Sequence, residues 1–330
     1  SSYDDLRERL SDVVVGWTRE RRAVNAGEIG AVGSMMVLLK DLLKPNLVQT
    51  AEGQPTIVHM GPFGNIAHGC SSIIADDLAT RGADYVVTEA GFGADLGFEK
   101  YMDIKVRQGG RQPHVAVVVV TVRGLRWHGG IDMGTLSEPN VDAVGKGSAN
   151  LAHAIGVVKK FGVPVVVAIN RFPDDTPEEI AVINGISRDS GANATVEAKG
   201  FSDGGSGMCQ LAEAVVEASD KDTEYRLLYE DSETIFEKVD TLALDVYGAG
   251  SVTWGPMTRT TARRFESNGW DFPICMAKTH LSVSTDPRLR GAPVGHELHV
   301  REVKVSAGAR QFIVLAGEIM TLPGLPIKPN

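Results

Sequence analysis

The sequence predicts an α/β fold in which a mostly parallel sheet is flanked by helices, with a further α/β domain and a small strand-rich C-terminal lobe. Short apolar segments alternate with helical patterns over roughly the first three quarters of the chain. The segment from Val115 to Val120 is apolar at every position, which is typical of a parallel strand buried on both faces. From Pro273 onward, strand-like segments separated by Gly and Pro turns replace the alternation.

The first part of the chain begins with two predicted helices. One covers Asp4 to Val15, and the other runs from Ile29 to Leu43, where apolar residues recur every three or four positions until Lys44-Pro45 ends the helix. The strands and helices expected next are a strand at Thr56 to His59, a helix at Ser71 to Thr80, a strand at Tyr85 to Thr88, a helix at Leu96 to Val106 and a strand at His114 to Val122.

The remaining elements continue the alternation and then change to strands. We expect a helix through Leu151 to Val158, a strand at Val163 to Asn170, helices around Leu211 to Val215 and Ile235 to Val246, and strands at Ile274 to Ala277, Leu298 to Val305 and Phe312 to Ala316. These patterns divide the chain into an α/β domain over residues 1–162, a second α/β domain over 163–270 and the strand-rich lobe over 271–330.

Composition excludes several classes of partner. The chain has 330 residues and a formal net charge of −9, with no block of basic residues, which argues against binding to nucleic acid or a membrane surface. Three scattered cysteines suit reduced thiols, and no apolar stretch approaches the length of a membrane span. We therefore expect a cytoplasmic protein that holds anionic ligands locally.

Two apolar segments each end in a glycine-rich turn, an arrangement that points backbone N–H groups at a phosphate or carboxylate. The first turn, residues 61–70, offers Asn65 and His68 beside these donors. The alternative is that His68 only satisfies backbone groups in a tight turn. The second turn contains Gly91 and Gly93, which we assign with Asn65 to phosphate binding.

Two carboxylates flank the second turn. Glu89 follows the predicted strand and Asp95 opens the next helix, so that they are candidates to orient Mg²⁺ through water molecules. The alternative for Asp95 is a helix cap.

A third set of polar residues follows the later strands. Arg123 is placed to bind a phosphate or carboxylate at the carboxyl end of a strand, where open α/β sheets bind ligands. Asn170 and Phe172 follow the next strand, where Asn170 can hydrogen-bond a heteroaromatic ring and Phe172 can stack on one. The alternatives are a solvated surface arginine and an ordinary core phenylalanine.

The polar segment from Lys199 to Gly207 contains one aromatic residue, Phe201, and is long enough to form a lid, although many such loops are only connectors. The histidines and cysteines show no metal-ligand spacing, so we predict no protein-ligated metal site. The sequence also contains no G-x-x-x-x-G-K-[ST] phosphate-binding loop.

Taken together, five segments of the sequence closely resemble formate-tetrahydrofolate ligases. They are GPFGNIAHGC at 61–70, DYVVTEAGFGADLG at 84–97, TVRGLRWHGG at 121–130, FGVPVVVAINRFP at 161–173 and MTLPGLP at 320–326. The resemblance runs in order along nearly the whole chain. It implies a fold similar to P-loop nucleotide-binding proteins and a reaction that makes 10-formyltetrahydrofolate from ATP, formate and tetrahydrofolate by way of formyl phosphate.

The resemblance also implies site residues and cofactors. Phe172 and Pro173 correspond to one side of the family's pterin slot, and the loop with Phe201, Gly204 and Gly205 corresponds to the other side, where the family has tryptophan. His68, Glu89, Asp95 and Arg123 fall in motifs that line the phosphate and formyl region, while Asn65, Gly91, Gly93 and Asn170 are assigned to the nucleotide. ATP and Mg²⁺ are the implied cofactors, and a monovalent cation is a further candidate.

Family members carry a P-loop upstream of the region that matches this chain, so we expect the chain to require a P-loop-bearing partner or segment for the full reaction. It is then a subunit of a split enzyme, a fragment, or a relative that has lost synthetase activity. The alternative function is a non-catalytic folate- or nucleotide-binding regulatory subunit. The family's tendency to form homotetramers makes a homo-oligomer the expected assembly.

Overall fold

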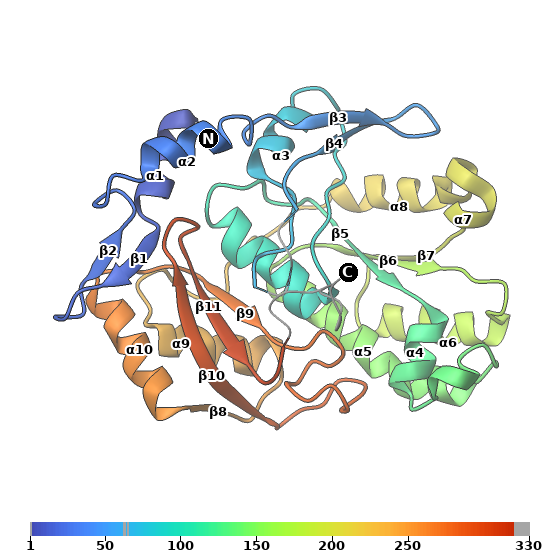
Figure 1. Ribbon diagram of the computed structural model, residues 1–330. Helices are drawn as coiled ribbons and strands as arrows, with labels where there is room; N and C mark the ends of the chain where they lie inside the picture. The colour runs from blue at the N-terminus through green and yellow to red at the C-terminus, as the bar shows by residue number, and fades with distance from the viewer. Residues whose placement is uncertain (1, 62–63, 65, 320–330) are drawn as a thin grey trace.

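The computed structural model describes residues 2–61, 64 and 66–319, and it contains two principal sheets (Figure 1). The first is parallel, in the order β5 (Ala116–Val120), β6 (Val165–Asn170) and β7 (Ala194–Ala198). The second is mixed, in the order β8 (Ser251–Trp254), β10 (Glu297–Ser306), β11 (Gln311–Ala316) and β9 (Ile274–Ala277). The α/β fold class and the strand-rich C-terminal part are therefore confirmed.

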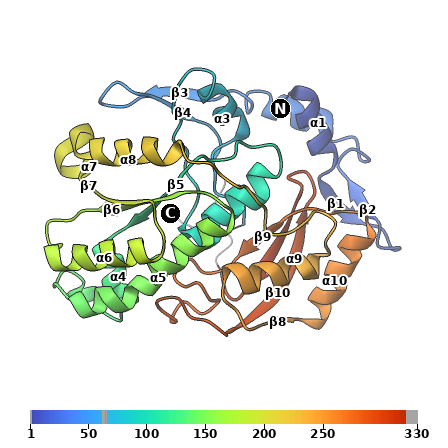
Figure 2. The ribbon, with the colours of Figure 1, turned by 180° about the vertical axis from the view of Figure 1, so that it is seen from behind.

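Helices cover both faces of the parallel sheet. Helix α8 (Cys209–Ser219) lies on one face, and α5 (Val141–Lys160) and α6 (Pro177–Asp189) lie on the other (Figures 1 and 2). Strand β6 is central, and its first five residues are buried on both faces. This double burial is the reason that its sequence is a continuous apolar run.

The mixed sheet packs against α9 (Ile235–Thr241) and α10 (Pro256–Ser267) (Figure 2). Strand β10 runs parallel to β8 and antiparallel to β11, while β11 runs parallel to β9. A hairpin of β1 (Val14–Trp17) and β2 (Ala23–Asn25) packs beside α10, where Trp17 stacks on Phe265 with ring centroids 5.8 Å apart.

A buried helical segment lies between the two sheets. It combines the wide helical turns η1 (Gly93–Phe98) and η2 (Tyr101–Val106), so that the predicted helix at 96–106 is confirmed with an earlier start. The remaining elements are α1 (Tyr3–Ser11), α2 (Val32–Leu39), β3 (Asn46–Gln49), β4 (Pro55–Val58), α3 (Ile73–Ala79), α4 (Val122–His128), η3 (Met133–Thr135), α7 (Gly200–Asp203), η4 (Gly204–Met208) and η5 (Leu242–Val246).

Two strand predictions require correction. Strand β4, predicted at 56–59, pairs antiparallel with β3 as a separate hairpin and does not join the parallel sheet. Residues 85–88 form no strand, and the Val87 side chain is 93% exposed. A run of β-branched and aromatic residues expresses strand propensity, but a strand also needs a hydrogen-bonding neighbour. The first helix also ends earlier than predicted, at Ser11, because β1 follows it.

Strand pairing crosses the predicted domain boundaries. Strands β5 and β6 lie on either side of the 162/163 boundary in one sheet, and β8 lies before residue 271 but belongs to the C-terminal sheet. The three-domain division stays a prediction. In the part of the chain that the structure describes, no helix has both the length and the apolar character needed to cross a membrane.

A buried ion pair joins α4 to α6 beneath the parallel sheet. Arg126 donates from Nε and Nη2 to the two carboxylate oxygens of Glu179, at 2.8 and 2.7 Å, and both side chains are fully buried. Burial alone raises the pKa of Glu179, but hydrogen bonds from Arg126 and the backbone N–H groups of Asn140 and Thr176 lower it to about 2. The pair is therefore ionised at neutral pH.

We expect Arg126→Met to lower the free energy of unfolding by about 3–5 kcal/mol, because it leaves a buried carboxylate without its partner. In the unaltered protein, the folded pKa of Glu179 lies below its unfolded value. The stabilisation is thus complete above about pH 5 and is lost as the pH falls toward 2. Urea unfolding between pH 3 and pH 7 measures both effects. An unchanged unfolding free energy for the variant at pH 7 would contradict this role.

One face of β5 is incompletely covered. Val117 and Val119 are 39% and 67% exposed, whereas Val120 is buried. Among the described strands, β5 pairs with β6 alone. An exposed apolar edge strand of this kind favours association with other chains.

We predict that Val119→Lys reduces self-association of the chain, because a lysine interrupts the apolar edge without entering the core. Its melting temperature should stay within about 2 °C of the original, as expected for a surface substitution. The matched control Val167→Lys, at a fully buried position of β6, should unfold the protein. Light scattering and thermal melting at several protein concentrations test both variants; undiminished scattering by Val119→Lys would contradict the prediction.

Candidate active site

The two predicted glycine-rich turns pack against each other through their backbones. A Cβ atom on Gly69 would lie 3.1 Å from the Cα atom of Gly64 and 3.4 Å from that of Gly91. A Cβ atom on Gly97 would lie 1.9 Å from the carbonyl oxygen of Gly91. Only glycine permits these approaches, so the structure brings together two segments that the sequence analysis assigned to anion binding.

Lys100 and His68 both bond to the first turn. Lys100 Nζ donates to the carbonyl oxygens of Gly64 and Ala67 at 2.8 and 3.4 Å. His68 Nδ1 accepts from the backbone N–H of Cys70 at 3.1 Å, as the structural alternative for this histidine predicted. Burial, followed by the charges of Lys105 and Lys100, lowers the pKa of His68 to about 4, so that its ring is neutral at pH 7. Asn65 lies outside the described residues.

Asp95 is paired with a lysine from the C-terminal part of the chain. Its Oδ2 atom lies 2.9 Å from Lys278 Nζ. The first helical turn is capped at Phe92 without a side-chain hydrogen bond, so the alternative that Asp95 is the helix cap is wrong. His280 stacks on Phe92 in the same turn, with ring centroids 5.1 Å apart. Neither Lys278 nor His280 lies in a local sequence motif, so neither could be predicted as part of this site.

The other residues of the second turn are accessible. Glu89 is exposed on the irregular segment before it, and Gly93 is exposed with a φ of +57°. Gly91 is partly buried against Gly69. Backbone atoms of the turn therefore reach the surface beside the Asp95 carboxylate.

A second group lies at the carboxyl ends of β5 and β6. Arg123 forms two hydrogen bonds with Asp174, Nε to Oδ2 at 3.1 Å and Nη2 to Oδ1 at 2.7 Å. The Arg123 guanidinium also lies over the ring of Phe172, 4.8 Å from its centroid. The expected meeting of Arg123 and Phe172 at one sheet edge is confirmed, and Asp174 is an additional member that the sequence analysis missed.

Asn170 and Pro173 complete this group. Asn170 is the last residue of β6 and pairs with Ala198 of β7, while Pro173 is exposed. Because Ala198 leads directly into the segment that carries Phe201, the two aromatic residues follow neighbouring strands. Glu179, which binds Arg126, also accepts from the backbone N–H of Asn140 and ties this edge to α5.

The predicted lid segment is helical. Residues 200–208 form α7 and η4, and the Phe201 side chain is 99% exposed. Gly204 has a φ of +61°, and the N–H of Gly205 donates to Glu52 Oε1 at 2.7 Å. Glu52 belongs to the turn between β3 and β4, so this hairpin holds the segment in place.

The segment that follows β9 contacts both groups of elements. Lys278 and His280 reach the second glycine-rich turn, as described above. Further along, Arg290 Nη1 donates to the carbonyl oxygen of Ile131 at 2.9 Å, and the N–H of Gly291 donates to His128 Nδ1 at 3.0 Å. His128 ends α4, the helix that carries Arg123. The C-terminal part of the chain thus contacts elements that carry candidate residues of both groups.

The described residues include no group of three or more His, Cys, Asp and Glu side chains arranged to hold a metal ion. Magnesium that accompanies a nucleotide, however, takes most of its ligands from phosphates and water and only one or two from carboxylates. The partly exposed carboxylate of Asp95, beside backbone N–H groups, fits that limited role.

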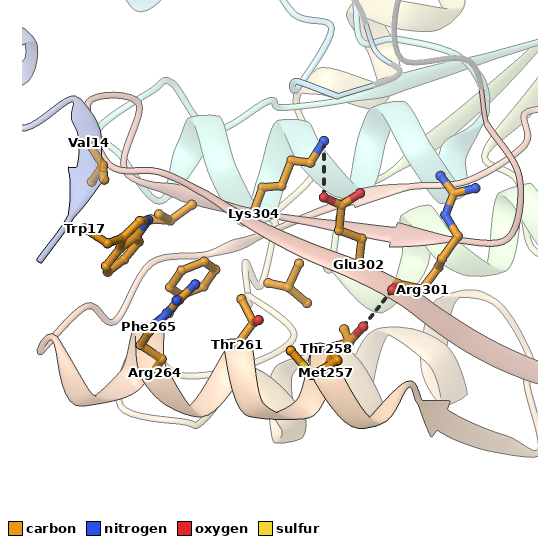
Figure 3. Close-up of a pocket in the computed structure, with 12 residues that line it drawn as sticks. Val14, Trp17, Met257, Thr258, Thr261, Arg264, Phe265, Arg301, Glu302 and Lys304 are labelled. Atoms are coloured by element: carbon orange, nitrogen blue, oxygen red, sulfur yellow. Dashed lines mark hydrogen bonds and ion pairs between the residues drawn. The ribbon is translucent and has the colours of Figure 1, made fainter. Parts of the chain in front are cut away.

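An open groove of about 570 Å³ lies elsewhere, between α10 and β10 (Figure 3). The Arg264 guanidinium lies 4.3 Å from the ring centroid of Trp17 at one end, and Lys304 lies 3.5 Å from Glu302 along β10. None of the predicted site residues lines this groove. It is therefore separate from the candidate site.

The whole chain is similar to proteins of one known family. The family model for formate-tetrahydrofolate ligase matches residues 1–330. The chain is 49% identical over 338 residues to the formate-tetrahydrofolate ligase of Roseiflexus castenholzii, which covers 100% of this chain and 60% of the relative. It is also 49% identical to the ligases of Sphingobium sp., over 100% of this chain and 59% of the relative, and Rhizobium meliloti, over 99% and 58%.

The chain spans about 60% of the length of these curated relatives. The matches cover nearly the whole of this chain. On this evidence the chain belongs to the formate-tetrahydrofolate ligase family.

Proposed function

We propose that this chain supplies the tetrahydrofolate-binding residues and part of the phosphate-handling residues of a formate-tetrahydrofolate ligase. The observation that carries the proposal is the contact of Arg123 with Phe172 at the carboxyl ends of β5 and β6, with the Phe201 segment following β7. This arrangement places a cation beside an aromatic face, which suits a ligand that combines a flat heteroaromatic ring with a reacting anionic group.

The proposed reaction couples two transfers. A formate oxygen attacks the γ-phosphorus of ATP, ADP leaves, and formyl phosphate forms. N10 of tetrahydrofolate then attacks the formyl carbon, the bond from that carbon to the phosphate oxygen breaks, and N10 loses its proton as inorganic phosphate leaves. The products are 10-formyltetrahydrofolate, ADP and phosphate.

Each step requires features that the site offers. Arg123 carries a permanent charge that stabilises the acyl phosphate and the oxyanion formed on attack. The backbone N–H groups around Gly91 and Gly93 suit a phosphate, and Asp95 would orient Mg²⁺ through water, where the ion would neutralise phosphate charge. His68 is neutral and bonded within its own turn, so we assign it to shaping that turn. Phe172 and Phe201 would enclose the pterin.

ATP binding in this proposal also requires a P-loop. The sequence has no G-x-x-x-x-G-K-[ST] motif, and the lysine next to glycine in Gly145-Lys146 lacks that spacing. We therefore assign the P-loop to a further segment or to a separate chain that assembles with this one. We expect the assembly to be a homo-oligomer in the cytoplasm. A monovalent cation is a further candidate cofactor.

The direct test is formation of 10-formyltetrahydrofolate that depends on both formate and ATP, measured with the chain alone and with a P-loop-bearing polypeptide supplied from a relative's upstream segment. Turnover that appears only in the mixture supports the proposal. Tetrahydrofolate binding without turnover in any mixture would instead support the alternative, a regulatory folate-binding subunit, which the substitution of phenylalanine for tryptophan at position 201 favours.

We predict that Phe172→Ala and Phe201→Ala each weaken tetrahydrofolate binding by about 1–2 kcal/mol, because each removes one stacking face. This corresponds to roughly a 5- to 30-fold increase in Kd. Nucleotide affinity should change little. Calorimetric titration measures both ligands, and Phe236→Ala is the control, since Phe236 packs on Trp254 in the other sheet. Unchanged folate affinity in both site variants would exclude the assigned pterin slot.

A further inference from the structure

We propose that Lys278 is a positioning residue that fixes the Asp95 carboxylate at the glycine-rich turn and thereby makes the C-terminal sheet part of the phosphate side of the site. The functional meaning of this contact rests on the role proposed above for Asp95. The contact itself joins two segments that lie far apart in the sequence.

The pairing is geometrically specific. Lys278 Nζ lies 2.9 Å from Asp95 Oδ2, and the lysine side chain is fully buried, while that of Asp95 keeps 17% of its surface exposed. The other carboxylate oxygen, Oδ1, lies 2.7 Å from the position that a Cβ atom on Gly93 would occupy. The carboxylate thus lies between the lysine ammonium and the backbone of Gly93, and part of it remains accessible.

The lysine is itself held by its own segment. Its Nζ atom also donates to the carbonyl oxygens of Thr279 and Ser282, at 3.1 and 2.6 Å, and lies 5.1 Å from the ring centroid of Tyr247. The buried hydroxyls of Ser282 and Ser284 bond to each other at 2.9 Å and brace the turn that follows. An ammonium with three acceptors and no exposed surface has one available position, so it serves as a fixed support.

A second contact acts in parallel. The His280 ring stacks on Phe92 with an interplanar angle of 26°, and Phe92 precedes Asp95 by less than one helical turn. The same short segment after β9 therefore contacts both ends of the turn formed by residues 92–95. A carboxylate that orients a hydrated metal ion must keep its direction while the ion arrives, and these contacts provide that direction before a ligand binds.

The first test measures positioning without any ligand. Lys278→Met keeps the apolar stem and removes the charge, and amide hydrogen exchange of residues 91–97 should become at least about tenfold faster. The matched control is Lys238→Met, because Lys238 is equally buried and bonds to the carbonyl oxygens of Asp231, Asp271 and Phe272, distant from this turn. Equal protection of residues 91–97 in both lysine variants would overturn the proposal.

If Lys278→Met fails to fold, Asp95→Asn removes the ionic part of the same contact from the other side and is measured in the same way. Faster exchange of residues 278–284 in that variant supports the coupling, and unchanged exchange overturns it.

The second test uses the chain assembled with a P-loop-bearing polypeptide. Lys278→Met should raise the Kd of Mg²⁺-ADP about tenfold and leave the Kd of ADP without Mg²⁺ unchanged. Asp95→Asn should give the same increase, and the double variant should be no weaker than either single variant, because both changes remove one interaction. If the losses of Mg²⁺-ADP affinity in the two single variants add up in the double variant, the functional role proposed for the Lys278–Asp95 pair is wrong. Absence of Mg²⁺-ADP binding by the unaltered assembly would count against the proposed function, while the exchange experiment still decides the positioning role.

Discussion

The constraint on which the structure depends is the burial of a charged helix between two sheets. The helix from η1 to η2 carries Glu99, Lys100, Asp103 and Lys105, all buried. A buried charge is tolerated only when partners replace the water that it loses. Lys105 pairs with Asp76 of α3 at 2.5 Å, Asp103 with Arg107 at 3.1 Å, and Lys100 with two carbonyl oxygens of the first glycine-rich turn. Burial raises the pKa of Glu99, which favours its neutral form.

These pairings connect the core to the candidate site. Lys100 holds the turn that contains His68, and the first residues of the same helix form the turn with Gly93 and Asp95. That helix contacts β9 of the mixed sheet through η2 and contacts α5, which covers the parallel sheet, through η1. Both turns of the candidate site are thus supported by buried helical residues, and such support favours fixed positions for the side chains that the turns carry.

The sequence predicts most of what is local and little of what is distant. The apolar runs of β5 and β6 establish a parallel sheet, and the common direction of its strands brings Arg123 to Phe172. The strand at 85–88 was predicted wrongly because propensity does not supply a pairing neighbour. Asp174 is close to Phe172 in the sequence. However, it accepts two hydrogen bonds from Arg123 only because two strand ends lie side by side in the sheet, and a local motif does not show this. Lys278 could not be predicted from the sequence for the same reason, because its contact with Asp95 depends on how distant segments pack.

The two aromatic residues proposed to bind the pterin differ in how firmly the surrounding structure already positions them. Phe172 is half-buried, and Arg123 lies over its ring, so this side of the slot is formed before any ligand binds. Phe201 is almost fully exposed on a short helical segment whose tie to the β3–β4 hairpin includes the bond from Gly205 to Glu52. In the proposed pterin slot, Phe201 would therefore have to lose its exposure and its side-chain freedom on binding, and this loss costs part of the stacking energy. Under the proposed function, phenylalanine also offers less stacking area than the tryptophan that the family resemblance implies at this position, so that this cost offsets more of the stacking gained on this side of the slot.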